Sequence, residues 1–145
     1  MIIHNSEELE SCGEQLGSRL KGGEVIELIG DVGAGKTTFV RGLARGLAID
    51  DPITSPSFTI NCNYAGRDGI LLRHYDFYRL NDAGIMQMEL AEASSDRTAV
   101  VVVEWADSVK DVLPTEHIVI KINYLPTDGR SIQMIVPKTY NYLVS

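Results

Sequence analysis

The sequence predicts an α/β fold with a mixed, mostly parallel sheet that is flanked by helices and extended by antiparallel hairpins. Three patterns predict it. A glycine-rich loop at 30–37 lies between an apolar strand pattern and an amphipathic helix pattern. The branched apolar run at 99–103 is typical of a strand buried on both faces. Strict alternation of apolar and polar residues at 58–64 indicates a half-buried strand.

The glycine-rich loop reads Gly-Asp-Val-Gly-Ala-Gly-Lys-Thr, which matches the G-x-x-x-x-G-K-[ST] pattern. Its glycines let backbone N–H groups point inward at phosphate oxygens, where a Cβ would block the turn. Lys36 can reach the terminal phosphates, and the Thr37 hydroxyl can ligate Mg²⁺. An apolar strand at 25–29 precedes the loop and a helix follows it. The sequence therefore predicts a P-loop NTPase domain that binds a nucleoside triphosphate.

Length and charge limit what kind of protein this is. The chain of 145 residues predicts a single domain, 1–145. Its net charge of −7 opposes nonspecific binding to nucleic acid or anionic membrane, so any role in RNA chemistry is expected to depend on protein partners. Cys12 and Cys62 lack metal or redox spacing and read as small buried residues in a reducing cytosol. We expect no signal peptide and no membrane span.

The first two helices follow from capping and periodicity. Asn5 and Ser6 can cap a first helix that has acidic residues in its first turn and ends at 21–23. Its expected apolar stripe is Leu9, Cys12, Leu16 and Leu20. The helix after the glycine loop has Arg41 and Arg45 on its polar face. Its apolar face is Phe39, Val40, Leu43, Ala44 and Leu47.

The remaining elements alternate strands with one weaker helix. The strand at 58–64 and its antiparallel partner at 70–77 flank a loop of hairpin length. Residues 82–93 predict a helix, although Gly84 lowers its propensity. Alternation at 118–124 and 132–136 predicts a C-terminal hairpin.

A second anionic metal ligand is expected next to the loop, because Mg²⁺ held only by phosphate and one hydroxyl is not positioned for chemistry. Glu104 follows the buried strand at 99–103 directly. It is therefore expected at the carboxyl end of that strand, where such sheets bind ligands. The alternative is a solvated acid that ends a strand.

Two further segments offer polar groups for chemistry. His74 and Asp76 lie two apart on an extended segment and share a face, so Asp76 could orient a water or act as a base. The alternative is a pair of ordinary surface groups. For His74 we favour a structural or partner-contacting role. Arg79 could help neutralise the charge of a transferred phosphate, but we favour a surface ion pair for it.

The segment 54–58 is either a nucleotide-sensing segment or a plain turn that enters a strand. Ser57 in this segment offers a hydroxyl that could sense a γ-phosphate or its Mg²⁺. Trp105, the one tryptophan in the chain, is either a core plug or an aromatic beside the nucleotide.

Four motifs together resemble the TsaE (YjeE) family over nearly the whole chain. They are Gly30–Thr38, Ser55–Phe58, His74–Leu80 and Val103–Trp105. The resemblance implies a small bacterial, cytoplasmic ATPase of tRNA threonylcarbamoyladenosine biosynthesis that binds ATP and Mg²⁺ and hydrolyses ATP slowly alone. It also implies that the protein joins the TsaB–TsaD complex, meets tRNA only through that complex, and supports repeated threonylcarbamoyl transfer to adenosine 37 of tRNAs reading ANN codons.

The resemblance also assigns residue roles. It implies catalytic roles for Lys36, Glu104 and Asp76, with Asp76 needed for hydrolysis, and Mg²⁺ ligation by Thr37 and Glu104. The implied nucleotide contacts are Ser6, Gly33, Ala34, Gly35, Lys36, Thr37, Thr38, Trp105 and Arg130. Two departures stand out: Ser57 replaces the family's usual threonine, and 84–89 is a loose version of its acidic helix.

Three other functions fit a glycine-rich loop of this kind. A small-molecule kinase would need a lid and an acceptor pocket, and no insert of lid length is evident. A GTP switch would usually carry an Asn-Lys-x-Asp string, which the sequence lacks. A pure binding module would bind nucleotide without turnover.

Overall fold

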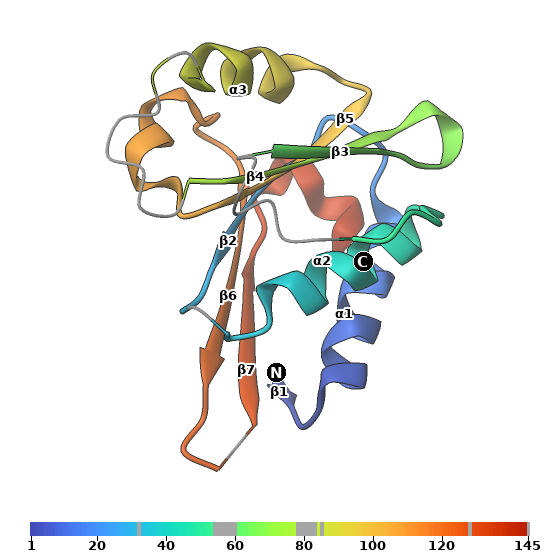
Figure 1. Cartoon of the computed structure of the whole chain (residues 1–145), viewed down its shortest axis with the longest axis vertical. Coiled ribbons are helices and arrows are strands. Elements are labelled where there is room, and N and C mark those ends of the chain that lie inside the picture. The colour runs from blue at the N-terminus through green and yellow to red at the C-terminus, as the bar shows by residue number, and fades with distance from the viewer. Residues whose placement is uncertain (32, 54–60, 78–83, 85, 128, 145) are drawn as a thin grey trace.

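The structure, a computed structural model, describes residues 1–31, 33–53, 61–77, 84, 86–127 and 129–144 (Figure 1). Within this part of the chain, a seven-stranded sheet runs in the order β1-β7-β6-β2-β5-β4-β3. The strands are β1 (Ile2–Ile3), β2 (Val25–Ile29), β3 (Asn61–Ala65), β4 (Leu71–Asp76), β5 (Ala99–Glu104), β6 (Ile118–Tyr124) and β7 (Arg130–Ile135). The α-helices are α1 (Ser6–Arg19), α2 (Lys36–Gly46) and α3 (Met86–Ser95), and the 3₁₀ helices are η2 (Arg67–Gly69), η3 (Ala106–Val112) and η4 (Lys138–Leu143).

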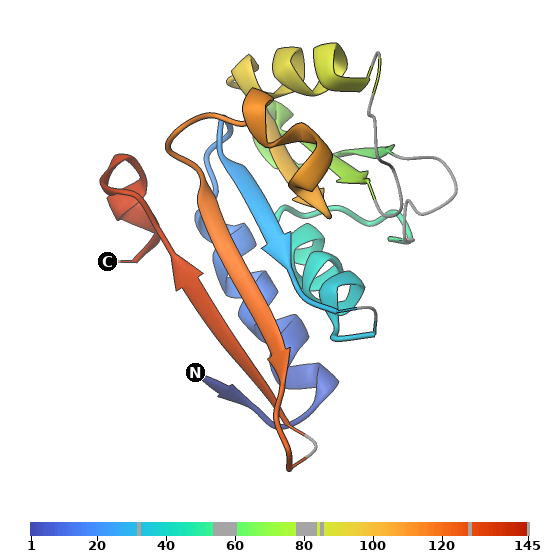
Figure 2. The same cartoon turned by 90° about the vertical axis from the view of Figure 1, so that its left-hand side faces the viewer.

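The sheet has a parallel centre and antiparallel edges, which confirms the predicted fold class. Strands β6, β2, β5 and β4 pair in parallel. Strand β3 is antiparallel to β4 at one edge, and β7 and β1 continue the sheet antiparallel at the other. Helices α1 and α2 pack on one face of the sheet, and α3 and η3 pack on the other face around β4 and β5 (Figure 2).

Helix α1 begins where the sequence predicts. The Asn5 side chain accepts a hydrogen bond from the Glu8 backbone N–H at 2.8 Å, which satisfies one of the free N–H groups of the first turn. The expected apolar stripe faces the core: its three leucines are buried and Cys12 is half-buried. The helix ends at Arg19, before the predicted stop at 21–23.

The contact between α1 and α2 depends on glycines that the apolar stripe did not reveal. A Cβ atom at Gly42 would lie 1.9 Å from the carbonyl oxygen of Glu10, and one at Gly17 would lie 2.2 Å from that of Leu43. Gly13 and Gly46 are equally tight. The two helices therefore approach backbone to backbone, which only residues without a Cβ permit.

The predicted hairpins and central strand are confirmed, with shifted ends. Strand β3 starts at Asn61, and residues 58–60 of the expected strand lie outside the described part. The helix η2 forms the turn between β3 and β4. Strand β4 ends at Asp76, one residue before the predicted end, and β7 begins at Arg130 rather than 132. Strand β5 is buried throughout and extends to Glu104.

Helix α3 covers 86–95, against the predicted 82–93, and residues 82, 83 and 85 lie outside the described part. The two-residue β1 was not predicted.

Among the described residues, no helix is long and apolar enough to cross a membrane.

The glycine contact yields a stability prediction. Gly42→Ala should destabilise the protein by about 2–3 kcal/mol in chemical denaturation, because overpacking against a backbone oxygen outweighs the roughly 1 kcal/mol that alanine gains in helix propensity. Arg41→Ala, at the exposed neighbouring position of α2, should change the stability by less than about 0.5 kcal/mol. Equal stability of the two variants would contradict the close helix contact.

Candidate functional site

The glycine-rich loop connects the end of β2 to the start of α2. Gly33 and Gly35 have φ angles of +81° and +112°, a left-handed conformation that side chains rarely adopt. Gly35 is the N-cap of α2 and has no side chain to cap it, so the N–H groups of the first helical turn remain available to an anion. The loop thus has the backbone geometry of a phosphate-binding turn.

Lys36, the first residue of α2, is 7% exposed and turns back over the loop. Its Nζ donates to the Gly30 carbonyl oxygen at 2.6 Å and lies 3.7 Å from Glu104 Oε1. The same ammonium lies 4.0 Å from the centroid of the Trp105 ring. Burial lowers the pKa of Lys36, and the carboxylates of Glu104 and Asp76 act in the opposite direction.

The acidic residues meet at the carboxyl ends of the parallel strands. Leu28, Glu104 and Asp76 pair across β2, β5 and β4 in one row. Glu104 is 4% exposed and Asp76 8%, so neither is the solvated surface acid considered as an alternative. Both follow the strand alternation that turns Leu72 and Val102 toward the α2 side of the sheet.

His74 also lies on the α2 side of the sheet, two residues before Asp76, which confirms the predicted shared face. It is fully buried, and its Nε2 hydrogen bonds Glu104 Oε2. The sequence alone did not predict this contact, because it joins residues on two different strands. One carboxylate therefore lies between His74 and Lys36.

The oxygen ligands at this edge fit a magnesium ion. Mg²⁺ prefers hard oxygen donors and usually binds one or two carboxylates together with substrate phosphates. Glu104 offers a buried carboxylate beside Lys36, and Thr37 offers a hydroxyl in the first turn of α2. Within the described ranges, no group of three or more His, Cys, Asp or Glu side chains is arranged to hold a metal.

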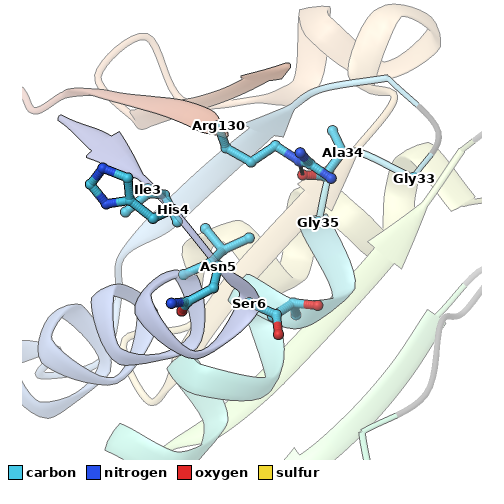
Figure 3. Close-up of a pocket in the computed structure, with 10 residues that line it drawn as sticks. Ile3, His4, Asn5, Ser6, Gly33, Ala34, Gly35 and Arg130 are labelled. Atoms are coloured by element: carbon cyan, nitrogen blue, oxygen red, sulfur yellow. Dashed lines mark hydrogen bonds between the residues drawn. The ribbon is translucent and has the colours of Figure 1, made fainter. Parts of the chain in front are cut away.

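A cavity of about 210 Å³ lies on the other side of the loop, between the start of α1 and the start of β7 (Figure 3). Ser6 and Arg130, which are far apart in the sequence, both line it, as do Gly33, Ala34, Gly35 and Thr38. The Arg130 side chain points at the loop, and its Nε donates to the Ala34 carbonyl oxygen at 3.0 Å. Ile3, His4, Asn5 and Leu9 complete the lining, and no motif in the sequence marks these four for a site.

Trp105 is neither a core plug nor remote from the loop. It is half-buried, with a left-handed φ of +55° directly after β5, and its ring lies beneath the Lys36 ammonium. It also lines a second cavity of about 330 Å³, with Gly30, Asp31 and Lys36. Ser57, the segment 54–58 and Arg79 lie outside the described residues, so the predictions on them stay predictions.

The strand–glycine loop–helix unit in a sheet with a parallel centre defines an α/β protein of the P-loop type. Residues 3–132 match the family described as Threonylcarbamoyl adenosine biosynthesis protein TsaE. The chain therefore belongs to the TsaE family, which confirms the resemblance seen in its motifs.

Individual relatives agree with this assignment. The chain is 40% identical over 129 residues to the tRNA threonylcarbamoyladenosine biosynthesis protein TsaE of Bacillus subtilis. The matched residues cover 88% of this chain and 79% of that protein. It is 36% identical over 131 residues to the TsaE protein of Treponema pallidum, with 90% and 96% covered. The crystal structure of Bacillus subtilis YdiB is similar with a TM-score of 0.77 and 34% identity, covering 99% of this chain and 88% of that one.

The contact between Arg130 and the loop can be tested without a ligand. In Arg130→Ala the Ala34 amide, which donates to Asp31 within the loop, should exchange its hydrogen about tenfold faster, because losing one hydrogen bond from a charged donor costs roughly 1.4 kcal/mol. Lys138→Ala, an exposed cation elsewhere, should leave this exchange unchanged. An unchanged Ala34 rate in Arg130→Ala would show that Arg130 does not support the loop.

Proposed function

We propose that this chain is a single P-loop ATPase domain, 1–145, that binds and hydrolyses ATP with Mg²⁺ to support turnover of the TsaB–TsaD complex. That complex would carry out threonylcarbamoylation of adenosine 37 in tRNAs reading ANN codons. Membership of the TsaE family and the names of its relatives support the pathway. One observation carries the ATPase role: the buried side chains of Lys36, Glu104 and Asp76 gather beside an anion-binding loop.

The two cavities suggest how the nucleotide would lie. The base and sugar would occupy the cavity between Ser6 and Arg130, and the phosphates would follow the loop toward Lys36. Gly33, Gly35, Thr37 and Thr38 would offer backbone N–H groups and hydroxyls along this path, and Ala34 would line it. Lys36 would exchange its contact with the Gly30 carbonyl for one with the terminal phosphates.

Thr37 and Glu104 would hold the magnesium ion, which neutralises charge on the phosphate oxygens when bound. Asp76 lies beside Glu104 in the strand register, on the side of the sheet that faces α2. In this proposal its carboxylate orients a water or accepts the proton of that water, which is the role that hydrolysis needs from this edge. Trp105 would lie next to the phosphates through its contact with Lys36.

The net charge of −7 favours protein partners over direct binding to tRNA. We therefore propose that the protein meets tRNA only through the TsaB–TsaD complex. We also propose that it acts in the cytoplasm. In this proposal the chain supplies nucleotide-driven turnover and does not itself transfer the threonylcarbamoyl group.

The test is ATP hydrolysis by this protein with and without its cognate TsaB–TsaD complex, alongside tRNA modification under the same conditions. Hydrolysis should rise with the partners, and modification should proceed beyond one round only when ATP can be hydrolysed. Hydrolysis that is slow and indifferent to the partners would contradict the proposal.

The phosphate role of Lys36 has its own test. Lys36→Ala should weaken ATP binding at least about 100-fold in calorimetry, because a buried charge-assisted contact is lost along with the Coulomb attraction. The Lys138→Ala variant serves as the control for net charge. An unchanged dissociation constant in Lys36→Ala would rule out phosphate binding at the loop.

Asp76→Asn separates binding from turnover. The amide keeps the size of the side chain but loses its charge and basicity, so ATP affinity should stay within about threefold while turnover falls roughly 10²-fold or more. Asn63→Asp is the matched control, because it interchanges the same two types of side chain, asparagine and aspartate, at an exposed position of β3. Wild-type turnover in Asp76→Asn would assign Asp76 to the scaffold.

A further inference from the structure

We propose that His74 is a positioning residue for the metal ligand: it holds one oxygen of Glu104 so that the other stays directed toward Lys36 and the magnesium position. This inference rests on the proposed function, since it needs Glu104 to bind Mg²⁺. It assigns His74 no contact with the nucleotide, the metal or the reacting water.

The location of His74 in the sheet makes its side chain a fixed point. It lies in β4 between Cys62 of β3 and Val102 of β5, so its backbone is held on both sides. The imidazole is fully buried. A ring fixed in this way can fix the group to which it hydrogen bonds.

The carboxylate of Glu104 is divided between two partners. Its Oε2 accepts from His74 Nε2, and its Oε1 lies 3.7 Å from Lys36 Nζ. Because a carboxylate only accepts hydrogen bonds, the hydrogen of this contact is assigned to Nε2. His74 therefore determines which oxygen of Glu104 turns to the loop.

The other ring nitrogen indicates that this contact, rather than folding, accounts for a histidine here. His74 Nδ1 is buried, and it has no hydrogen-bond partner within the part of the chain that the structure describes. A buried polar atom without a partner costs free energy, whereas an apolar side chain at this position would not carry that cost. The Nε2 contact with Glu104 is the gain that offsets it.

Fixing one oxygen has a consequence for metal binding. Mg²⁺ demands nearly ideal octahedral geometry, so a carboxylate that rotates freely is a poor ligand. Without His74, the carboxylate of Glu104 could rotate, and neither of its oxygens would keep a fixed direction toward the magnesium position. Partners that orient a metal ligand commonly change metal affinity by about 10- to 100-fold when they are removed.

The experiment is an Mg²⁺ titration of protein saturated with a non-hydrolysable ATP analogue, read by calorimetry, on three variants. His74→Leu removes the donor, and His74→Gln restores an N–H donor near the position of Nε2. Leu72→Val is the control, because it trims a buried side chain on the same strand and face. We expect Mg²⁺ binding about 10- to 100-fold weaker in His74→Leu and within about threefold of wild type in His74→Gln and Leu72→Val.

Two further readouts separate positioning from folding. Binding of the analogue without Mg²⁺ should be unchanged in every variant. If His74→Leu does not fold, the wild-type protein with ¹⁵N-labelled histidine provides the second measurement. On addition of Mg²⁺ to the nucleotide-bound protein, the ring signals of His74 should shift more than those of His4 and His117, the two other histidines of the chain.

The outcomes distinguish this inference from the proposed function. If the wild-type protein binds the analogue equally with and without Mg²⁺ and shows no Mg²⁺ binding, the proposed function fails. If wild-type Mg²⁺ binding is normal but His74→Leu matches it, or His74→Gln is as impaired as His74→Leu, the positioning role of His74 is overturned. Unshifted His74 signals on Mg²⁺ addition would overturn it as well.

Discussion

The parallel pairing of β2, β5 and β4 is the constraint on which the candidate site depends. Because the three strands run in one direction, their carboxyl ends meet at one edge of the sheet, and the register sets Glu104 beside Asp76. The alternation of side chains then turns both acids toward α2, whose first residue is Lys36. The sheet itself therefore positions both carboxylates, without the help of a loop.

Burying these charges would be costly without compensation within the protein. An ammonium or carboxylate removed from water loses several kcal/mol of hydration, as a rough figure, unless partners replace it. Lys36 has the Gly30 carbonyl, Glu104 and the Trp105 ring as partners, and Glu104 has His74 in addition. The left-handed Trp105 belongs to the same arrangement, because the turn after β5 directs its ring beneath the lysine.

Local features of the site could be predicted from the sequence, and long-range ones could not. The glycine loop, the strand before Glu104 and the shared face of His74 and Asp76 follow from spacing within short segments. The contact of His74 with Glu104 joins two strands, and periodicity does not specify which strands are neighbours. The role of Gly42 could not be predicted for another reason: apolar side chains define a stripe, whereas this helix contact depends on the absence of a side chain. The strand β1 is too short for any period to show.

The packing of α1 on α2 connects the core to the cavity between Ser6 and Arg130. The close glycine contact places the start of α1 beside the loop, and a Cβ at Gly35 would lie 2.5 Å from the Leu9 side chain. In the proposed function, phosphate would take over Lys36 and thereby release Glu104 Oε1 for the metal, while His74 keeps the other oxygen in place. Nucleotide and magnesium would then favour each other's binding, because both require the contact between Lys36 and Glu104 to break, and the ligand that binds first breaks it. This coupling follows directly from the buried ion pair that Lys36 and Glu104 form in the free protein.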